Sequence, residues 1–600
     1  RYERNNQNIG FVRTCNRAVQ DFADPRSDIL LLNSDTVVTE GSLEEMIACL
    51  YDCDRNAVCC PRSNNATLLT IPLKIAGDPY DFRSVSHRCW LALKDSLPRT
   101  SPIPTGVGFC MLIKRTIVDR FGLFDEAYGR GYNEENDFCC RINRYGYSVV
   151  AANHAYVFHD AGGSFLEKER ALLEAKNGKL LRKRYPEYDR EVHSYFTIGL
   201  PAAEHFADVL GGTYPRKKIL LDLSHLVASY SGTAEYALSL LRELHPLLSQ
   251  EFEVTVFAHP VVDHFFNLSM QYPRVLHSDR LPDERFDLVF VPQQVFSPLH
   301  LEQLNRLAVK WVINIQDIIA LRCGNLRTAD AEFSLRFSAK YAEGLLSVSH
   351  ASLADLENYL GPDAFRKDGL MTAIVHAYPE TRKEQDDTGV PESDFLFLVG
   401  NAFEHKALSE ALRHVPSDIP VVVLGGEDHP TSTRRKNIRF LKSGAVPEAL
   451  VDALYRRARV VLFPSQYEGF GLPLLHAAGC GTPVIACDTA AVREVKEAFG
   501  LGSIVHCFRT FEEIPVLIDR TIEAPRILPK ERRTWRDAAE DTAHFLHSVL
   551  ERPTDLRLLE ERTMLLRMLE RTRHKTVAGS RRGIRMLLWK IRKHARRFFA

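Results

Sequence analysis

The chain has 600 residues, enough for about three to five compact units of ~100–200 residues each. Its 77 basic and 77 acidic residues cancel to a formal net charge of zero, which excludes a global field that would draw it to nucleic acid. No apolar run approaches the ~18–20 residues of a membrane span. The 13 cysteines form no C-x-x-C pair, so we expect reduced, buried thiols in a cytosol.

Residues 1–200 are predicted to form one α/β unit. A buried strand at 28–33 runs into Asn33-Ser-Asp35, which places Asp35 at the carboxyl end of that strand. A carboxylate there can hold Mg²⁺ or Mn²⁺ while a diphosphate completes the metal shell. His159 follows a further apolar strand pattern at 149–152 and the Tyr-Val-Phe run before it.

Three carboxylates gather where a helix is expected to begin, namely Glu134, Glu135 and Asp137. Like charges raise one another's pKa toward working pH, which suits a proton-abstracting base. The same three residues could instead only stabilise the N-terminus of the helix, a contribution of ~0.3–1 kcal/mol.

Short motifs follow one another along residues 1–190. They are Asn8-x-Gly10-Phe11 with Asn16, Leu-Leu-Asn-Ser-Asp-Thr at 31–36, Gly-Leu-Phe-Asp-Glu at 122–126, Glu-Glu-Asn-Asp-Phe-Cys-Cys-Arg at 134–141, and His159. In this order they resemble the family-2 glycosyltransferases of GT-A fold, in particular rhamnosyltransferase-like members.

This resemblance implies an inverting, metal-dependent transferase. Asp35 and His159 would be the ligands of Mg²⁺ or Mn²⁺, and Glu135 would be the base that deprotonates the acceptor hydroxyl, with Glu134 or Asp137 as alternative bases. The donor-binding residues would be Asn8, Gly10, Asn16, Asn33 and Asp35. The family begins with a strand and a base-binding aspartate that nothing here matches, so we interpret 1–200 as an N-terminally truncated GT-A domain.

Glycine and proline at 211, 212 and 215 predict a linker over 201–216. Two series of apolar segments follow at the spacing of parallel strands separated by helices. The first lies at 219–223, 254–257, 288–291 and 309–315, and the second at 395–399, 421–424, 438–441, 460–463 and 484–486. We therefore predict two Rossmann-like halves, 217–390 and 391–552, with a cleft between them where ligands bind at strand carboxyl ends.

The segment 464–486 is the most specific motif of the chain. A buried strand breaks into a loop with Glu468, Gly469 and Gly471, and a helix is expected from Leu472. Glycines at such a turn allow backbone N–H groups to approach a diphosphate, and the helix N-terminus favours its negative charge. A carboxylate beside it can accept hydrogen bonds from sugar hydroxyls. The loop therefore predicts a nucleotide-sugar site.

Ser-x-x-Glu-Gly-Phe-Gly-Leu-Pro followed by Ala-x-x-Cys-Gly-Thr-Pro-Val-Ile-Ala resembles the donor signature of family-4 glycosyltransferases, which are retaining enzymes of GT-B fold. The resemblance implies catalytic roles for Lys406 and Glu468. It implies donor contacts from Gly400, Asn401, Lys406, Glu468, Gly469, Phe470, Gly471, Leu472 and His476. Two positions depart from the family: Asn401 replaces an arginine, and His476 replaces a glutamate that meets the ribose.

Residues 553–600 are predicted to form a helical basic tail. From Arg581 onward there are eight Lys or Arg and no acid, with apolar residues at helical spacing. Such a helix favours the surface of an anionic membrane. The alternative is a helix that packs on protein.

The sequence as a whole predicts a bifunctional hexosyltransferase at the cytoplasmic face of the plasma membrane. It would take nucleotide sugars as donors and a saccharide or lipid-linked saccharide as acceptor, and would assemble a surface polysaccharide. In the first alternative, the GT-B part is a degenerate, non-catalytic carbohydrate-binding or docking module. A GT-B epimerase is the second alternative. No nucleic-acid partner is expected.

Overall fold

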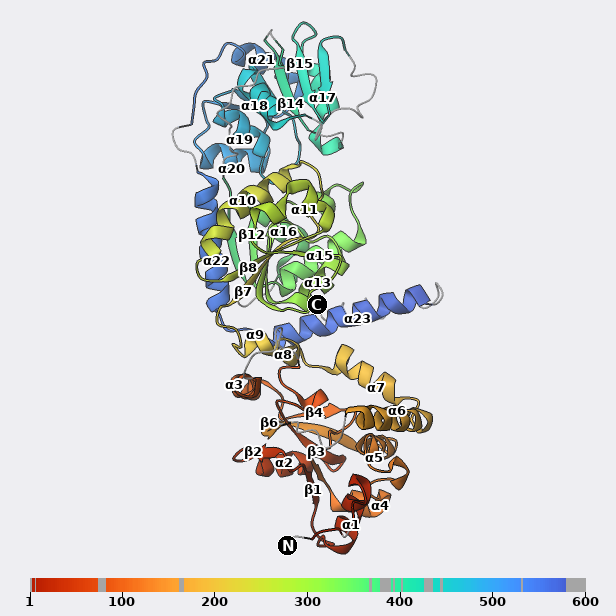
Figure 1. Cartoon of the computed structure of the whole chain (residues 1–600). Helices are drawn as coiled ribbons and strands as arrows, with labels where there is room; N and C mark the ends of the chain where they lie inside the picture. The colour runs from red at the N-terminus through yellow and green to blue at the C-terminus, as the bar shows by residue number, and fades with distance from the viewer. Residues whose placement is uncertain are drawn as a thin grey trace. The chain divides into compact units, whose positions relative to one another are not determined.

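The structure is a computed structural model. It describes residues 3–5, 7–73, 82–160, 167–365, 370–377, 390–391, 394–400, 403–425, 435–442, 446–529 and 533–578. The chain divides into two compact units (Figure 1). The first comprises residues within Arg1–Pro215 together with Asp283–Arg285 and Asp555–Lys575, and the second comprises residues within Arg216–Pro282 and Phe286–Thr554.

The first unit is built on a six-stranded mixed sheet with the order β1-β5-β3-β6-β2, in which β4 also pairs with β6. The strands are β1 (Ile29–Leu32), β2 (Thr36–Val38), β3 (Asn56–Arg62), β4 (Thr100–Ile103), β5 (Cys110–Ile113) and β6 (Ser148–His159). Every residue of β3 is buried, as expected of a central strand covered on both faces. β3 runs parallel to β6, whereas β2 and β4 pair with β6 in the antiparallel sense.

The helices of this unit are α1 (Phe11–Asp21), α2 (Ser42–Tyr51), α3 (Phe82–Leu93), α4 (Arg115–Phe121), α5 (Glu134–Asn143), α6 (Glu167–Arg184), α7 (Tyr188–Ser194), α8 (Ala202–His205), α9 (Ala207–Leu210) and α23 (Leu556–Ala578). The segment 201–216, interpreted from its glycines as a linker, thus contains two short helices. Ala202 and Ala207 in these helices and Phe206 between them are fully buried, because their small and aromatic side chains pack into the unit.

The predicted tail also takes part in the first unit. The backbone N–H of Ala202 donates to Glu560 Oε2 on α23 at 2.6 Å, and Arg567 Nη1 donates to the carbonyl of Leu200 at 2.5 Å. The basic segment 581–600, on which the membrane prediction depends, lies outside the described residues. Within the helices that the structure does describe, none combines the length and apolarity required to cross a membrane.

The second unit contains two parallel sheets, which agrees with the predicted α/β class and its two Rossmann-like halves. The seven-stranded sheet has the order β13-β12-β11-β10-β7-β8-β9 and the six-stranded sheet has the order β16-β15-β14-β17-β18-β19. The strands of the first are β7 (Lys218–Leu223), β8 (Glu253–Ala258), β9 (Val275–His277), β10 (Phe286–Val291), β11 (Ala308–Ile315), β12 (Gly344–Ser347) and β13 (Met371–Ile374). Those of the second are β14 (Leu396–Val399), β15 (Val421–Leu424), β16 (Ile438–Leu441), β17 (Val460–Phe463), β18 (Val484–Cys487) and β19 (Val505–Phe508).

Helices connect these strands. They are α10 (Gly232–Leu248), α11 (Pro260–Phe266), α12 (Leu268–Gln271), α13 (Pro298–Leu307), α14 (Ile319–Arg322), α15 (Ala329–Tyr341), α16 (His350–Leu360), α17 (Leu408–His414), α18 (Glu448–Arg457), α19 (Leu472–Gly479), α20 (Ala490–Ala498), α21 (Ile514–Thr521) and α22 (Trp535–Glu551). After the second sheet, α22 packs back against α10 of the first half (Figure 1). Lys310 fixes the end of α22 by donating to the carbonyl of Val549 at 2.9 Å. Helix α22, which follows the second sheet in the chain, is therefore packed as part of the first half.

Candidate functional site

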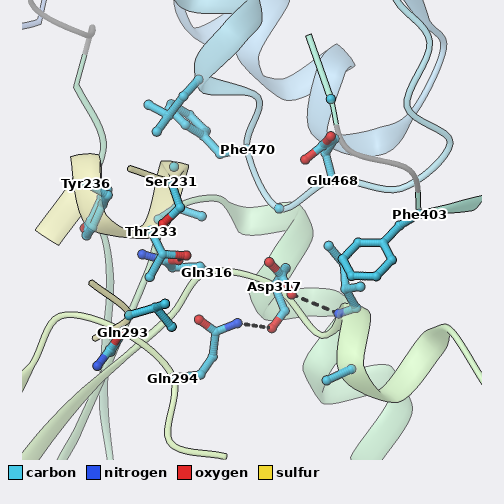
Figure 2. Close-up of a pocket in the computed structure, with 18 of the residues that line it drawn as sticks. Ser231, Thr233, Tyr236, Gln293, Gln294, Gln316, Asp317, Phe403, Glu468 and Phe470 are labelled. Carbon is cyan, nitrogen blue, oxygen red and sulfur yellow. Dashed lines mark hydrogen bonds between the residues drawn. The ribbon is translucent and has the colours of Figure 1, made fainter. Parts of the chain in front are cut away.

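A cavity of about 770 Å³ lies at the carboxyl ends of strands from both halves of the second unit (Figure 2). This is the position where open parallel sheets bind ligands. Polar side chains reach it mostly from the first half, and the predicted donor loop reaches it from the second. The lining includes Ser231, Thr233, Tyr236, Gln293, Gln294, Gln316 and Asp317 on one side and Lys406, Glu468 and Phe470 on the other.

The donor loop is anchored on the first half through Gly469. A Cβ atom added there would lie 1.9 Å from the carbonyl oxygen of Gln316, so no side chain fits. The carbonyl of Gly469 accepts a hydrogen bond from Ser349 Oγ at 2.5 Å. Gly471 has φ +108°, a conformation that favours glycine, and it precedes α19. The backbone packing and conformation of the loop therefore require glycine at both positions.

Lys406 and Glu468 form an ion pair inside the cavity. Lys406 Nζ donates to Glu468 Oε1 at 2.5 Å, and the two side chains are 20% and 11% exposed. Figure 2 shows Asp317 and Glu468 beside the same space. Burial, assisted by the neighbouring charge of Glu468, raises the pKa of Asp317 to about 6, although the hydrogen bond from the Ile319 N–H and the charge of Lys406 oppose the shift. The charge of Lys406 acts on both Glu468 and Asp317, and an anionic ligand could compete with Glu468 for this cation.

The other predicted donor residues divide into three groups. Gly400, Gly469, Phe470, Gly471 and Leu472 line the cavity with Lys406 and Glu468. Asn401 lies outside the described residues. The predicted donor contact of His476 needs correction, because this residue is not among the described residues that line the cavity.

His476 instead points toward α18. Its Nε2 lies 2.7 Å from Asp452 Oδ1, and its ring stacks on Tyr455 with centroids 4.2 Å apart. Leu472 and Pro473 in the first turn of α19 line the cavity, whereas His476 lies one turn further along the helix, where α18 packs against it.

Further polar residues meet around the cavity. Thr233 Oγ1 donates to Gln316 Oε1 at 2.9 Å, and Gln294 Nε2 donates to the carbonyl of Asp317 at 2.9 Å (Figure 2). His225 and His300 also line the cavity. The pair of glutamines that follows β10 could have been found from its place at a strand end, whereas the histidines belong to no local motif.

In the first unit, the structure brings Asp35 and His159 together. The antiparallel register of β2 and β6 sets Thr36 opposite His159, and the neighbouring Asp35 Oδ1 then lies 3.6 Å from His159 Nε2. His159 Nδ1 is 2.6 Å from the carbonyl oxygen of Asn65. Over the described part of the chain, no group of three or more His, Cys, Asp or Glu side chains forms a metal cage.

The acidic residues of α5 differ in their surroundings. Burial raises the pKa of Glu134 to about 8, with a further contribution from the charge of Glu135, and burial also raises the pKa of Glu135. The prediction of Asp137 as an alternative base needs correction, because this carboxylate is 2% exposed and already paired with an arginine. It accepts from Tyr128 Oη at 3.1 Å and from Arg184 Nη1 at 3.0 Å, so it stabilises the fold and is not available as a base.

The remaining predicted residues of the first unit make local contacts. Asn16 Nδ2 donates to the carbonyl of Phe124 at 2.8 Å, and its Oδ1 accepts from the N–H of Phe124 at 3.1 Å. Both ends of its side-chain amide therefore make hydrogen bonds within the unit. Asn8 Oδ1 accepts from the N–H of Gly10 at 3.0 Å. Gly10 has φ +85°, and the N–H of Asn33 donates to the carbonyl of Phe109 at 2.9 Å.

Comparison with known proteins assigns part of the chain to a protein family. Residues 380–542 match the family model described as glycosyl transferases group 1. O-antigen chain mannosyltransferase B of Escherichia coli is 45% identical over 69 residues, which are 12% of this chain and 18% of that protein. A D-inositol 3-phosphate glycosyltransferase of Kineococcus radiotolerans is 30% identical over 188 residues, 27% of this chain and 43% of that protein.

Among solved structures, sucrose-phosphate synthase from Thermosynechococcus elongatus is 15% identical with a TM-score of 0.36, and the alignment covers 61% of this chain and 100% of the other. The chain spans less than half the length of the two curated relatives described above. The second unit therefore contains a glycosyltransferase group 1 domain, and the chain has mannosyltransferase homologues.

Proposed function

We propose that the second unit is a retaining glycosyltransferase that takes a nucleoside diphosphate sugar as donor and extends a surface polysaccharide. The Lys406–Glu468 ion pair carries this proposal, because it lies in a large cavity within the segment that matches the glycosyltransferase family. The names of the relatives make mannose the first sugar to test.

The chemistry follows from the charges. Negative charge builds on the diphosphate as the bond to the sugar breaks, and a preorganised cation stabilises that charge. Lys406 Nζ lies 2.5 Å from Glu468 Oε1, so the diphosphate would replace Glu468 as the partner of this cation. The released carboxylate of Glu468 can then accept hydrogen bonds from the sugar hydroxyls.

For the first unit we propose a second, inverting transferase of GT-A type that uses Mg²⁺ or Mn²⁺. Asp35 and His159 would hold the ion, and their 3.6 Å separation suits two ligands of one cation. The contact of His159 Nδ1 with the Asn65 carbonyl favours a proton on Nδ1 and leaves Nε2 to face Asp35. A divalent cation bound there would neutralise charge on a diphosphate.

In this proposal Glu135, or Glu134 beside it, accepts the proton of the acceptor hydroxyl. Their raised pKa values favour that role, because a base works best when its pKa lies near the operating pH. The basic segment 581–600 would hold the protein at the cytoplasmic face of the membrane, where the acceptor could be lipid-linked.

A second candidate function is that the second unit binds carbohydrate without turnover. The placement of His476 against Asp452 favours it, because the position that meets the ribose in the family is turned away from the cavity. Asn401 in place of arginine favours it as well.

Two measurements on the whole chain separate these functions. Calorimetry with GDP, UDP, ADP and dTDP tests donor binding, and incubation with GDP-mannose and a mannoside acceptor tests transfer. We expect a nucleoside diphosphate to bind and the product to keep the anomeric configuration of the donor. Nucleotide binding without transfer, or no nucleotide binding at all, would contradict the transferase and favour the binding module.

A further inference from the structure

The start of α16 carries three polar side chains at intervals of three residues. They are Ser349, which is the N-cap of the helix, Ser352 and Asp355. Side chains three residues apart are neighbours on the surface of a helix. Ser349 and Ser352 are buried, and the side chain of Asp355 is 24% exposed. We call these three residues the polar face of α16.

The polar face of α16 holds the donor loop on both sides of Glu468. After this residue in the chain, the carbonyl oxygen of Gly469 lies 2.9 Å from Ser352 Oγ. Before it, the hydroxyl of Tyr467 donates a hydrogen bond to Asp355 Oδ2. Glu468 therefore lies between two residues that are both bound to α16, one through its backbone and one through its side chain.

The same face holds the segment that carries Asp317 on the other side of the cavity. Ser352 Oγ also lies 2.9 Å from the carbonyl oxygen of Gln316. Asp317 Oδ1 accepts from the first backbone N–H of α14 at 2.9 Å, and Arg322 at the end of α14 donates through Nε to Asp355 Oδ1 at 3.0 Å. The segment is thus fixed before and after Asp317.

Asp355 is the residue on which the two segments converge. Its carboxylate binds Tyr467, which precedes Glu468, and Arg322, which belongs to the segment of Asp317. Hydrogen bonds to an ionised group are stronger than those between neutral groups. Asp355, Tyr467 and Arg322 are not among the described residues that line the cavity. Any influence of Asp355 on a ligand therefore passes through its neighbours.

The hydroxyl of Tyr467 keeps its proton in this arrangement. Burial raises the pKa of Tyr467, and the hydrogen bond to Asp355 and the charges of Asp355 and Asp317 raise it further. A hydrogen bond from the backbone N–H of Ile318 opposes the shift. The neutral hydroxyl can therefore donate to Asp355 while it accepts from the backbone beside Asp317.

We propose that Asp355 is a positioning residue for sugar transfer, which through Tyr467 and Arg322 holds Glu468 in place opposite Asp317. Its part in transfer rests on the proposed function of the second unit, whereas the anchoring of the donor loop does not.

An anchor that does not involve Lys406 matters for the proposed chemistry. When the diphosphate takes Lys406, the side chain of Glu468 loses the ion pair that holds it. The contacts of Tyr467 and Gly469 with α16 lie outside that ion pair and remain. The carboxylate then meets the sugar hydroxyls from a fixed backbone, so less ordering is required on binding.

Hydrogen exchange on the whole chain tests the anchoring without a ligand. Asp355→Asn and Tyr467→Phe keep the size of each side chain and remove the charge or the hydroxyl. The backbone amides of 465–471 should exchange about tenfold faster in both variants, because local opening becomes easier when an anchor is lost. Glu357→Gln, at an exposed position of α16, is the matched control and should exchange like the wild type. Thermal melting checks that each variant is folded.

Calorimetry tests the effect on the sugar. The probes are GDP with GDP-mannose, UDP with UDP-glucose, ADP with ADP-glucose and dTDP with dTDP-glucose. Tyr467→Phe and Asp355→Asn should weaken binding of the nucleotide sugar relative to its nucleoside diphosphate by about tenfold, the lower end for a hydrogen bond to a charged group. In a Glu468→Gln background, Tyr467→Phe should have no further effect on this ratio, because it acts through Glu468.

These measurements separate positioning from a general contribution to stability. Wild-type exchange of 465–471 in both variants, an unchanged ratio of the two Kd values, or an equal further loss in the Glu468→Gln background would each overturn the proposal. Faster exchange of 465–471 in a chain that binds none of the nucleotides would contradict the transferase function and support the anchoring of the donor loop by Asp355.

Discussion

Substitution of the two partners of the Lys406–Glu468 ion pair should have opposite effects on the binding of a nucleoside diphosphate. A charged hydrogen bond contributes about 1.5–3 kcal/mol, or about 10- to 150-fold in Kd. Lys406 must first give up Glu468, whose oxygen lies 2.5 Å away, so we expect Lys406→Ala to weaken binding by the lower part of this range, about tenfold. The alanine variant also leaves Glu468 and Asp317 facing the anionic ligand without a cation.

Glu468→Gln keeps the shape of the side chain and removes the competing charge. Binding of GDP or UDP should then be unchanged or tighter, while transfer of the sugar falls because the carboxylate no longer accepts from its hydroxyls. The assay is calorimetry at pH 7.5 and fixed salt, since screening changes exposed charge interactions. Thermal melting checks that each variant is folded, and the exposed Lys436→Ala is the matched control. Wild-type affinity in Lys406→Ala, or equal losses in both variants, would refute the reasoning.

Four further predictions concern other parts of the molecule. The pKa of Asp317 is raised to about 6 by burial, so the wild type loses stability as pH rises from about 4 to 7, and Asp317→Asn should gain melting temperature over the wild type at pH 7 but not at pH 4, measured in melts across that range. Gly469→Ala should lower the melting temperature and abolish nucleotide binding, since its Cβ would lie 1.9 Å from the carbonyl oxygen of Gln316; a stable variant with full binding would contradict this. Asp35→Ala should abolish Mn²⁺ binding and metal-dependent transfer by the first unit, measured by calorimetry and by activity with and without EDTA, with GDP binding by the second unit unchanged. Deletion of 581–600 should release the protein from anionic vesicles at low salt in a sedimentation assay, and an intact chain that ignores such vesicles would argue against a membrane role.

Much of the second unit could be predicted because its signals are local. A parallel strand buried on both faces is a short β-branched run, and the runs at 219–223 and 460–463 show this without knowledge of their neighbours. The donor loop is likewise one continuous segment in which Glu468 and the glycines are near in sequence. Lys406 could be placed with it only through the resemblance to a family.

Contacts between distant segments were decided by the tertiary structure. Asp35 and His159 meet because β2 pairs with β6 in one register, and a shift by one residue would turn His159 to the other face of the sheet. The packing of α18 against α19 pairs His476 with Asp452, and Asp137 is occupied by Arg184 from α6, far along the chain. The burial of Ala202 and Phe206 likewise depends on the unit around them, whereas their glycine-rich surroundings had indicated a linker.

Asp222, His300 and His225 show the same division most clearly. The sequence by itself determined that Asp222 lies in a buried strand at 219–223, because hydrophobic patterning is a property of neighbouring residues. Only the fold decided that His300, 78 residues later, lies 2.6 Å from it and that His225 stacks on His300 at the cavity surface. Pairing and stacking depend on where separate elements pack, and that packing is set by the burial of the whole sheet rather than by the residues adjacent in the chain.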